Sequence, residues 1–198
     1  DGRIVRMVEY KDADAGERAC RLCNSGLLAA RAGDLFALLG RVGNANAQGE
    51  YYLPDIVNIA IADGRPCAVI IAASADEVAG INSRAELAVA EGRWQAARRR
   101  RAMADGATLI APETVFFAHD TVLGRDVTIE PNVFFGPGVV VGDGVLIRAH
   151  CHIEGARLER GVKVGPFARL RPGTVLEEGS FIGNFVEVKN AVLHPGAK

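Results

Sequence analysis

The 198-residue sequence predicts an α/β region, then a connecting α-helix, then a parallel β-helix. Three observations support this order. Apolar runs alternate with amphipathic segments before residue 83, a capped helical stretch follows, and a six-residue apolar repeat continues to the end of the sequence. We therefore predict three parts, formed by residues 1–83, 84–105 and 106–198.

Residues 1–83 contain both strand-like and helix-like segments. Residues 4–8, 27–30 and 67–72 are apolar runs of the kind found in sheet strands. Asp34 can cap a short apolar helix, and Pro54 suits the first position of a second helix. Strands that alternate with helices predict an α/β fold for this part.

A helix is predicted over residues 84–104. Ser83 and Glu86 have the spacing of a capping box, in which each side chain bonds the other residue's backbone N–H. Gly106 lies where a helix often ends on a glycine. Because the segments on its two sides differ in texture, we interpret this helix as a connection, with Trp94 packed inward.

The rest of the sequence is a hexapeptide repeat that starts near Phe117. Aliphatic or aromatic residues recur every six positions, with two slips of one residue, and are predicted to fill a three-sided coil. They are Leu123, Ile129, Phe135, Val141, Ile147 and Ile153, then Leu158, Val164, Leu170, Leu176, Ile182 and Val188, and then Leu193. Smaller residues four positions later, from Val127 to Val192, are expected near the corners. The period itself leaves the handedness and the oligomeric state open.

Composition excludes several classes of function. Lys and Arg number 23 and Asp and Glu 24, so the net charge of -1 offers no general attraction to nucleic acid or to an anionic membrane. No apolar run reaches the ~20 residues of a membrane span. Four cysteines, including the pair Cys20 and Cys23, lack the further ligands of a zinc site. We expect reduced thiols and a cytoplasmic protein.

Two cations are placed by the repeat itself. Arg171 and Lys189 are 18 residues apart, which is three hexapeptides, so each should lie one coil from the other on one face. Two close cations repel each other, and an anion such as a phosphate between them would relieve this. Neutralisation by Glu187 and other carboxylates is an equally good explanation at this point.

Three other polar groups have plain alternatives. A polar set in the first part, with Glu9, Asn24 and Asn82 among its members, is explained as well by turns and surface positions. The run 98–101 of four arginines could bind nucleic acid or a membrane, but the polar face of a helix explains it better. His150 and His152 could share one face of a strand, but no third metal ligand is evident.

Several long motifs resemble one known family, and they cover nearly the whole chain. The family is the bacterial bifunctional enzyme with N-acetylglucosamine-1-phosphate uridylyltransferase and glucosamine-1-phosphate acetyltransferase activities. The similar segments are Val8–Ala13, Asn24–Gly26, Asn46–Asp55, Gly80–Arg84, Gly165–Gly173 and Gly183–Lys189. The resemblance implies a nucleotidyltransferase-domain fragment in residues 1–83 and a left-handed β-helix in residues 106–198. It also implies a homotrimer.

The resemblance also implies roles for single residues. Glu9 and Asn24 match residues that bind the sugar, and Asn82 matches a Mg²⁺ ligand that also contacts substrate. Arg171 and Lys189 match residues that hold the phosphate of glucosamine 1-phosphate. UTP, N-acetylglucosamine 1-phosphate and acetyl-CoA are the other implied substrates. The family's catalytic histidine base would come after Lys198, so no catalytic residue is assigned within the chain.

The sequence lacks an initiator Met and stops inside a repeat, so we expect a piece of a longer chain that catalyses neither half-reaction alone. Two alternatives remain open. One is a sugar-1-phosphate nucleotidyltransferase of another specificity with a structural or regulatory β-helix. The other is a non-enzymatic trimerisation or scaffold module.

Overall fold

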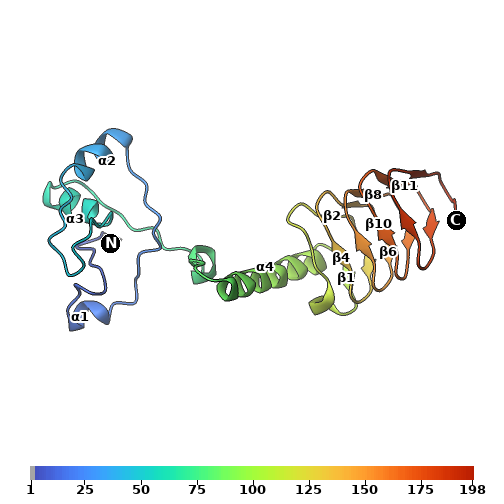
Figure 1. Cartoon of the computed structure of the whole chain (residues 1–198), viewed down its shortest axis with the longest axis horizontal. Helices are drawn as coiled ribbons and strands as arrows, with labels where there is room; N and C mark the ends of the chain where they lie inside the picture. Colours follow the sequence, from blue (N-terminus) through green and yellow to red (C-terminus); the bar gives the residue numbers. More distant parts are fainter. Residues whose placement is uncertain (1–2) are drawn as a thin grey trace. The chain divides into compact units, whose positions relative to one another are not determined.

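The structure, a computed structural model, describes residues 3–198 and consists of two compact units that meet between Gly80 and Ile81. The long helix therefore falls in the second unit, together with the repeats (Figure 1). Among residues 3–198, no helix combines the length and the apolar character of a membrane span. The assignment of residues 1–83, 84–105 and 106–198 as three functional parts stays a prediction.

The first unit has a small core between two helices. Leu38 of α2 (Ala32–Leu39) packs near Ile56 and Ala60 of α3 (Asp55–Ala62), and all three side chains are buried. The unit also contains α1 (Ala15–Arg18) and the 3₁₀-helix η1 (Ala75–Val78). Arg31 precedes α2, so Asp34 lies in the first turn of the helix and is not its cap, as we had predicted.

The expected strands of the first unit are not formed, and the α/β prediction is wrong for the described residues. Residues 4–8, 27–30 and 67–72 carry no ladder, and a single antiparallel bridge joins Arg3 to Ala68. A strand needs a neighbour that pairs with its backbone N–H and C=O groups. Val5 and Ile70 are 84% and 95% exposed, so these apolar runs have no such neighbour within residues 3–80.

The predicted helix over 84–104 is confirmed as α4 (Arg84–Ala104). The Ser83 hydroxyl accepts the Glu86 N–H at 3.1 Å, but the Glu86 carboxylate bonds the N–H of Asn82 and not that of Ser83. Our expectation that Trp94 packs inward is wrong. Trp94 is 39% exposed, whereas the neighbouring Gln95 is buried.

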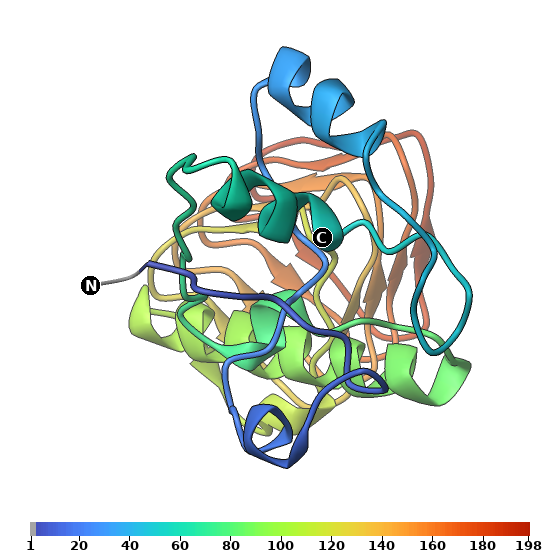
Figure 2. The same ribbon diagram turned by 90° about the vertical axis from the view of Figure 1, so that its left-hand side faces the viewer.

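The second unit is a parallel β-solenoid with three sheets, each built from every third strand (Figures 1 and 2). The first sheet contains β1 (Thr108–Leu109), β3 (Thr128–Ile129), β6 (Leu146–Ile147), β9 (Lys163–Val164) and β12 (Phe181–Ile182). The second contains β4 (Phe134–Phe135), β7 (His152–Ile153), β10 (Arg169–Leu170) and β13 (Glu187–Val188). The third contains β2 (Val122–Leu123), β5 (Val140–Val141), β8 (Ala156–Leu158), β11 (Thr174–Leu176) and β14 (Val192–Leu193). The short 3₁₀-helix η2 (Pro112–Thr114) lies between β1 and β2.

The predicted interior positions are confirmed. Ten of the thirteen repeat residues, from Ile129 to Ile182, are at most 4% exposed, and Leu123, Val188 and Leu193 pack partly against them. Register follows the period, because Ile129 pairs with Ile147, 18 residues on. Ile147 pairs with Val164, only 17 residues on, because the sequence slip shortens that coil by one residue.

Candidate functional site

The outer face of the second sheet carries the two cations that the repeat predicted. Leu170 in β10 pairs with Val188 in β13, and both point into the solenoid. Arg171 and Lys189 follow these two residues directly, and the Arg171 N–H bonds the Val188 carbonyl at 2.9 Å. The structure therefore places the two cations on neighbouring strands of one face.

Arg171 is already paired with a carboxylate. Its Nη1 lies 3.0 Å from Oε1 of Glu187, and these side chains are 35% and 51% exposed. An ion pair with this exposure contributes little, about 0–1 kcal/mol. The Nε of Arg171 is buried and has no hydrogen-bond partner within residues 3–198. The guanidinium is therefore held in place by Glu187 and still has an unsatisfied donor.

The cations on this face outnumber the carboxylates. Arg169 in β10 lies beside Glu187 in register, and its Nη2 is 4.0 Å from Oε1 of Glu154. Lys189 makes no ion pair or side-chain hydrogen bond in the described part of the chain. Three cations thus face two carboxylates, which leaves a charge that an anion can balance. Neutralisation by carboxylates, the alternative left open above, is realised for Arg171 but not for Lys189.

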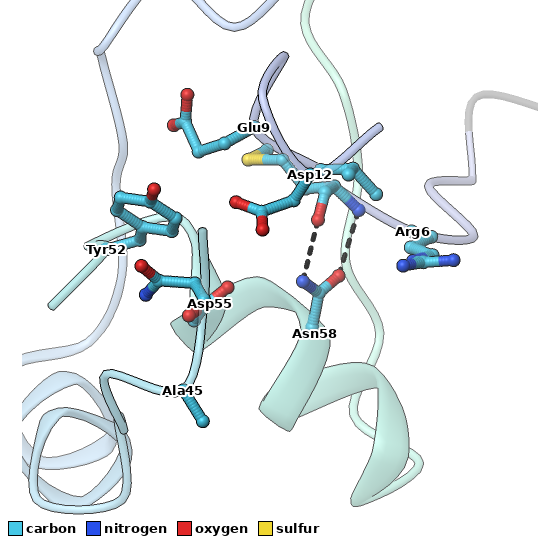
Figure 3. A pocket seen from close by; sticks show the side chains of 10 residues that line it. Arg6, Glu9, Asp12, Ala45, Tyr52, Asp55 and Asn58 are labelled. Carbon is cyan, nitrogen blue, oxygen red and sulfur yellow. Dashed lines mark hydrogen bonds between the residues drawn. The ribbon is translucent and has the colours of Figure 1, made fainter. Parts of the chain in front are cut away.

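A second candidate site is a pocket of about 330 Å³ in the first unit (Figure 3). Carboxylates, a phenol and amides dominate its lining. The lining residues are Arg6, Met7, Val8, Glu9, Asp12, Ala45, Asn46, Tyr52, Asp55 and Asn58. Asn58 ties two walls together, because its side chain accepts the Met7 N–H at 2.9 Å and donates to the Met7 carbonyl at 2.7 Å. Acceptor-rich walls of this kind suit hydroxyl groups better than phosphate.

The predicted sugar and metal residues do not share this pocket. Glu9 lines it, whereas the exposed Asn24 does not, and the Asn24 side chain instead accepts the Gly26 N–H at 3.0 Å. Asn82 belongs to the second unit and is exposed beside the start of α4. Within residues 3–198, no three His, Cys, Asp or Glu side chains form a metal-binding group. The described residues alone therefore do not fit a Mg²⁺ site around Asn82.

The two histidines are parts of aromatic rows, which the sequence reasoning missed. His150 is not in a strand, as we had expected. It lies at a turn with φ +60°, and its ring stacks on Phe167 at 4.7 Å. His152 points out from β7 and stacks on Phe134 at 4.9 Å. An 18-residue spacing search for aromatic residues would have found both rows.

Titration is shifted at few groups. Burial raises the pKa of the Cys151 thiol, which points into the solenoid, so this cysteine stays protonated and is a poor nucleophile. The hydrogen bond from Arg41 lowers the pKa of Asp63 beside α3. Neither group lies in the pocket or on the cationic face.

Comparisons with known proteins agree with this division. Residues 120–155 match the family described as bacterial transferase hexapeptide (six repeats). The "Bifunctional protein GlmU" of Sphingopyxis alaskensis is 69% identical over 189 residues, which are 96% of this chain and 42% of that protein. The protein of the same name from Zymomonas mobilis is 58% identical over 98% of this chain and 43% of its own length. The chain thus spans about two fifths of these relatives.

A solved structure with partial similarity is a mutant of perosamine N-acetyltransferase from Caulobacter crescentus in complex with CoA and GDP-perosamine. It is 21% identical, and the match covers 54% of this chain and 59% of that chain, with a TM-score of 0.31. At this score the likeness carries no argument about function.

Proposed function

The chain belongs to the family of the bifunctional GlmU proteins, and from this premise we propose that the whole protein makes UDP-N-acetylglucosamine in two steps. Acetyl would pass from acetyl-CoA to the amine of glucosamine 1-phosphate, and a uridylyl group would then pass from UTP to N-acetylglucosamine 1-phosphate. The observation that carries the first step is the placement of Arg171 and Lys189 on neighbouring strands.

In this proposal the second-sheet face holds the sugar phosphate. A guanidinium can give a phosphate two parallel hydrogen bonds, whereas the ammonium of Lys189 adds a point charge. Glu187 orients the guanidinium while the site is empty, through the 3.0 Å contact. Phosphate oxygens would then satisfy donors of Arg171 that Glu187 leaves free.

The residues of the first part would serve the uridylyl step. Glu9 and Asn24 would accept hydrogen bonds from, or donate them to, the sugar, and the acceptor-rich pocket beside Glu9 supports this. Asn82 would give an amide oxygen to Mg²⁺, a hard ligand that this ion prefers. Since no further ligands gather around Asn82 in the described residues, no reaction step is derived through the metal.

The remaining features of the proposal follow from family membership. Residues 1–83 would be the nucleotidyltransferase part, 84–105 the connection, and 106–198 a left-handed β-helix of the acetyltransferase part. The whole protein would work as a cytoplasmic homotrimer. The 198-residue chain would catalyse neither step by itself, so release of pyrophosphate from UTP by this chain would contradict the proposal.

The direct test is calorimetric titration of the 198-residue chain with glucosamine 1-phosphate. Arg171→Ala should weaken binding about tenfold, because a hydrogen bond to a charged group contributes ~1.5–3 kcal/mol and solvent screens this half-buried group. Lys189→Ala should weaken it about two- to fivefold, since its ammonium is exposed. Glu187→Gln should tighten binding up to a few-fold by removing a competitor for the guanidinium.

Two matched controls lie on the other sheets. Arg157 on β8 and Lys163 on β9 are exposed and point outward, so Arg157→Ala and Lys163→Ala should leave the affinity unchanged. Equal effects of Arg171→Ala and Arg157→Ala would refute the phosphate site and favour a scaffold module. A whole protein that fails to acetylate glucosamine 1-phosphate would favour a nucleotidyltransferase of another specificity.

A further inference from the structure

The first coil of the solenoid has an open edge. Each coil bonds the next through alternate residues, as when Phe116 donates its N–H to the Val133 carbonyl at 3.0 Å and accepts the Phe135 N–H at 2.8 Å. In a parallel pair the N–H and C=O of the following residue point to the other side. Phe117 therefore directs both groups away from the stack, although its side chain is 3% exposed. Unpaired backbone groups in such a place are costly.

Gln95 of α4 pairs with both of these groups. Its Oε1 accepts the Phe117 N–H at 3.0 Å, and its Nε2 donates to the Phe117 carbonyl at 2.8 Å. A side-chain amide has the same donor and acceptor as a peptide group, so Gln95 occupies the place that a strand of a preceding coil would take. The residue is itself only 3% exposed, and its amide is fully used because Nε2 also contacts Glu91.

Two arginines of the run extend this pairing along the same edge. Nη2 of Arg98 donates to the Thr121 carbonyl at 2.7 Å, and its guanidinium lies 5.1 Å from the centre of the Phe117 ring. Nη1 of Arg99 donates to the Val115 carbonyl at 3.0 Å. Half of the cationic run is thus committed to backbone carbonyls of the first coil, a use that neither interpretation of the run anticipated.

We propose that α4 is the N-terminal cap of the β-solenoid, with Gln95, Arg98 and Arg99 as its capping residues. Stacked repeats need a terminal element with a polar outer face, because an open edge pairs with any other available edge. The partner that fits the uncapped edge is the same edge of a second copy of this chain. The cap therefore keeps the solenoid from joining end to end and holds the first coil closed.

The test is amide hydrogen exchange on the full 198-residue chain. In Gln95→Ala and in the double variant Arg98→Ala/Arg99→Ala, amides between residues 108 and 129 should exchange about tenfold faster or more, which corresponds to ~1.4 kcal/mol. Amides between residues 164 and 182, about three coils away, should keep their protection because solenoid coils stabilise mainly their neighbours. Sedimentation of the same variants should show concentration-dependent association.

Arg100→Ala is the matched control, since Arg100 is exposed on the same helix and makes no contact of this kind within the described residues. If Gln95→Ala proves too damaging to fold, Gln95→Glu keeps the acceptor for the Phe117 N–H, loses the donor, and should give a smaller, local loss of protection. Equal exchange in Arg100→Ala and the double variant, or unchanged exchange in both Gln95 variants, would overturn the proposal.

Discussion

The tightest contact inside the solenoid lies between Gly165 and Cys151, and it allows a sharp prediction. Gly165 is buried with φ +86°, and a Cβ atom added there would lie 2.4 Å from the Cys151 Sγ. The next nearest atoms are at least 3.5 Å away, an ordinary contact distance. Gly165→Ala should therefore meet two separate penalties, one from the backbone and one from the sulfur.

The two penalties can be sized separately. A residue with a Cβ in the left-handed region costs roughly 1–2 kcal/mol. Overpacking a well-filled interior typically costs about 1–3 kcal/mol more. Gly165→Ala should then lower the free energy of unfolding by about 2–5 kcal/mol. In a Cys151→Ala background the sulfur is gone, so only the backbone cost of roughly 1–2 kcal/mol should remain.

A double-mutant cycle measured by urea unfolding, followed by far-ultraviolet circular dichroism, separates the two penalties. The coupling between the two substitutions should be about 1–3 kcal/mol in the rescuing direction. Gly161→Ala is the control, because Gly161 has φ +69° and no atom within 4 Å of its added Cβ. Additive effects, or a Gly165→Ala loss no larger than that of Gly161→Ala, would refute the steric argument.

Two further predictions follow from shifted pKa values. Burial raises the pKa of Cys151 and covers its sulfur, whereas Cys20 is exposed, so a thiol reagent should label Cys20 in the native chain and Cys151 only after unfolding; labelling of both at one rate, read by peptide mass, would contradict this. Arg41 lowers the pKa of Asp63 in the folded chain, so the stability this carboxylate contributes is present above its unfolded pKa of about 3.9 and is lost as the pH falls through the folded value. Tyrosine absorbance, which reports only on the first unit, should show that Asp63→Asn flattens this acid-side loss, and an unchanged slope would count against it.

Local patterns predicted the second unit well. The capping residue Ser83 and the glycine after the helix indicated α4 with both ends correct. The six-residue period indicated the buried positions and even the shortened coil, which appears as the 17-residue register step from Ile147 to Val164. Both signals are short in range, because a helix satisfies its own backbone and each coil repeats the geometry of the previous one.

The candidate sites were predictable only where that repeat extends to them. Arg171 and Lys189 follow interior residues three hexapeptides apart, so their shared face followed from the spacing. The ion pair of Arg171 with Glu187 did not, since carboxylate neighbours are chosen by side-chain conformation. The pocket beside Glu9 joins residues 6–12 to residues 45–58, and no local pattern reports such a junction.

By itself, the sequence determined the solenoid: its period, its inward-facing residues, the helix before it and the alignment of two cations on one face. Tertiary structure alone decided three other matters: which apolar runs of the first unit find strand partners, which residues line its pocket, and that Gln95 rather than Trp94 turns inward against the first coil. The physical reason is range. Periodic hydrophobicity is written in neighbouring residues, whereas backbone pairing and pocket walls depend on groups that meet only after the chain has folded.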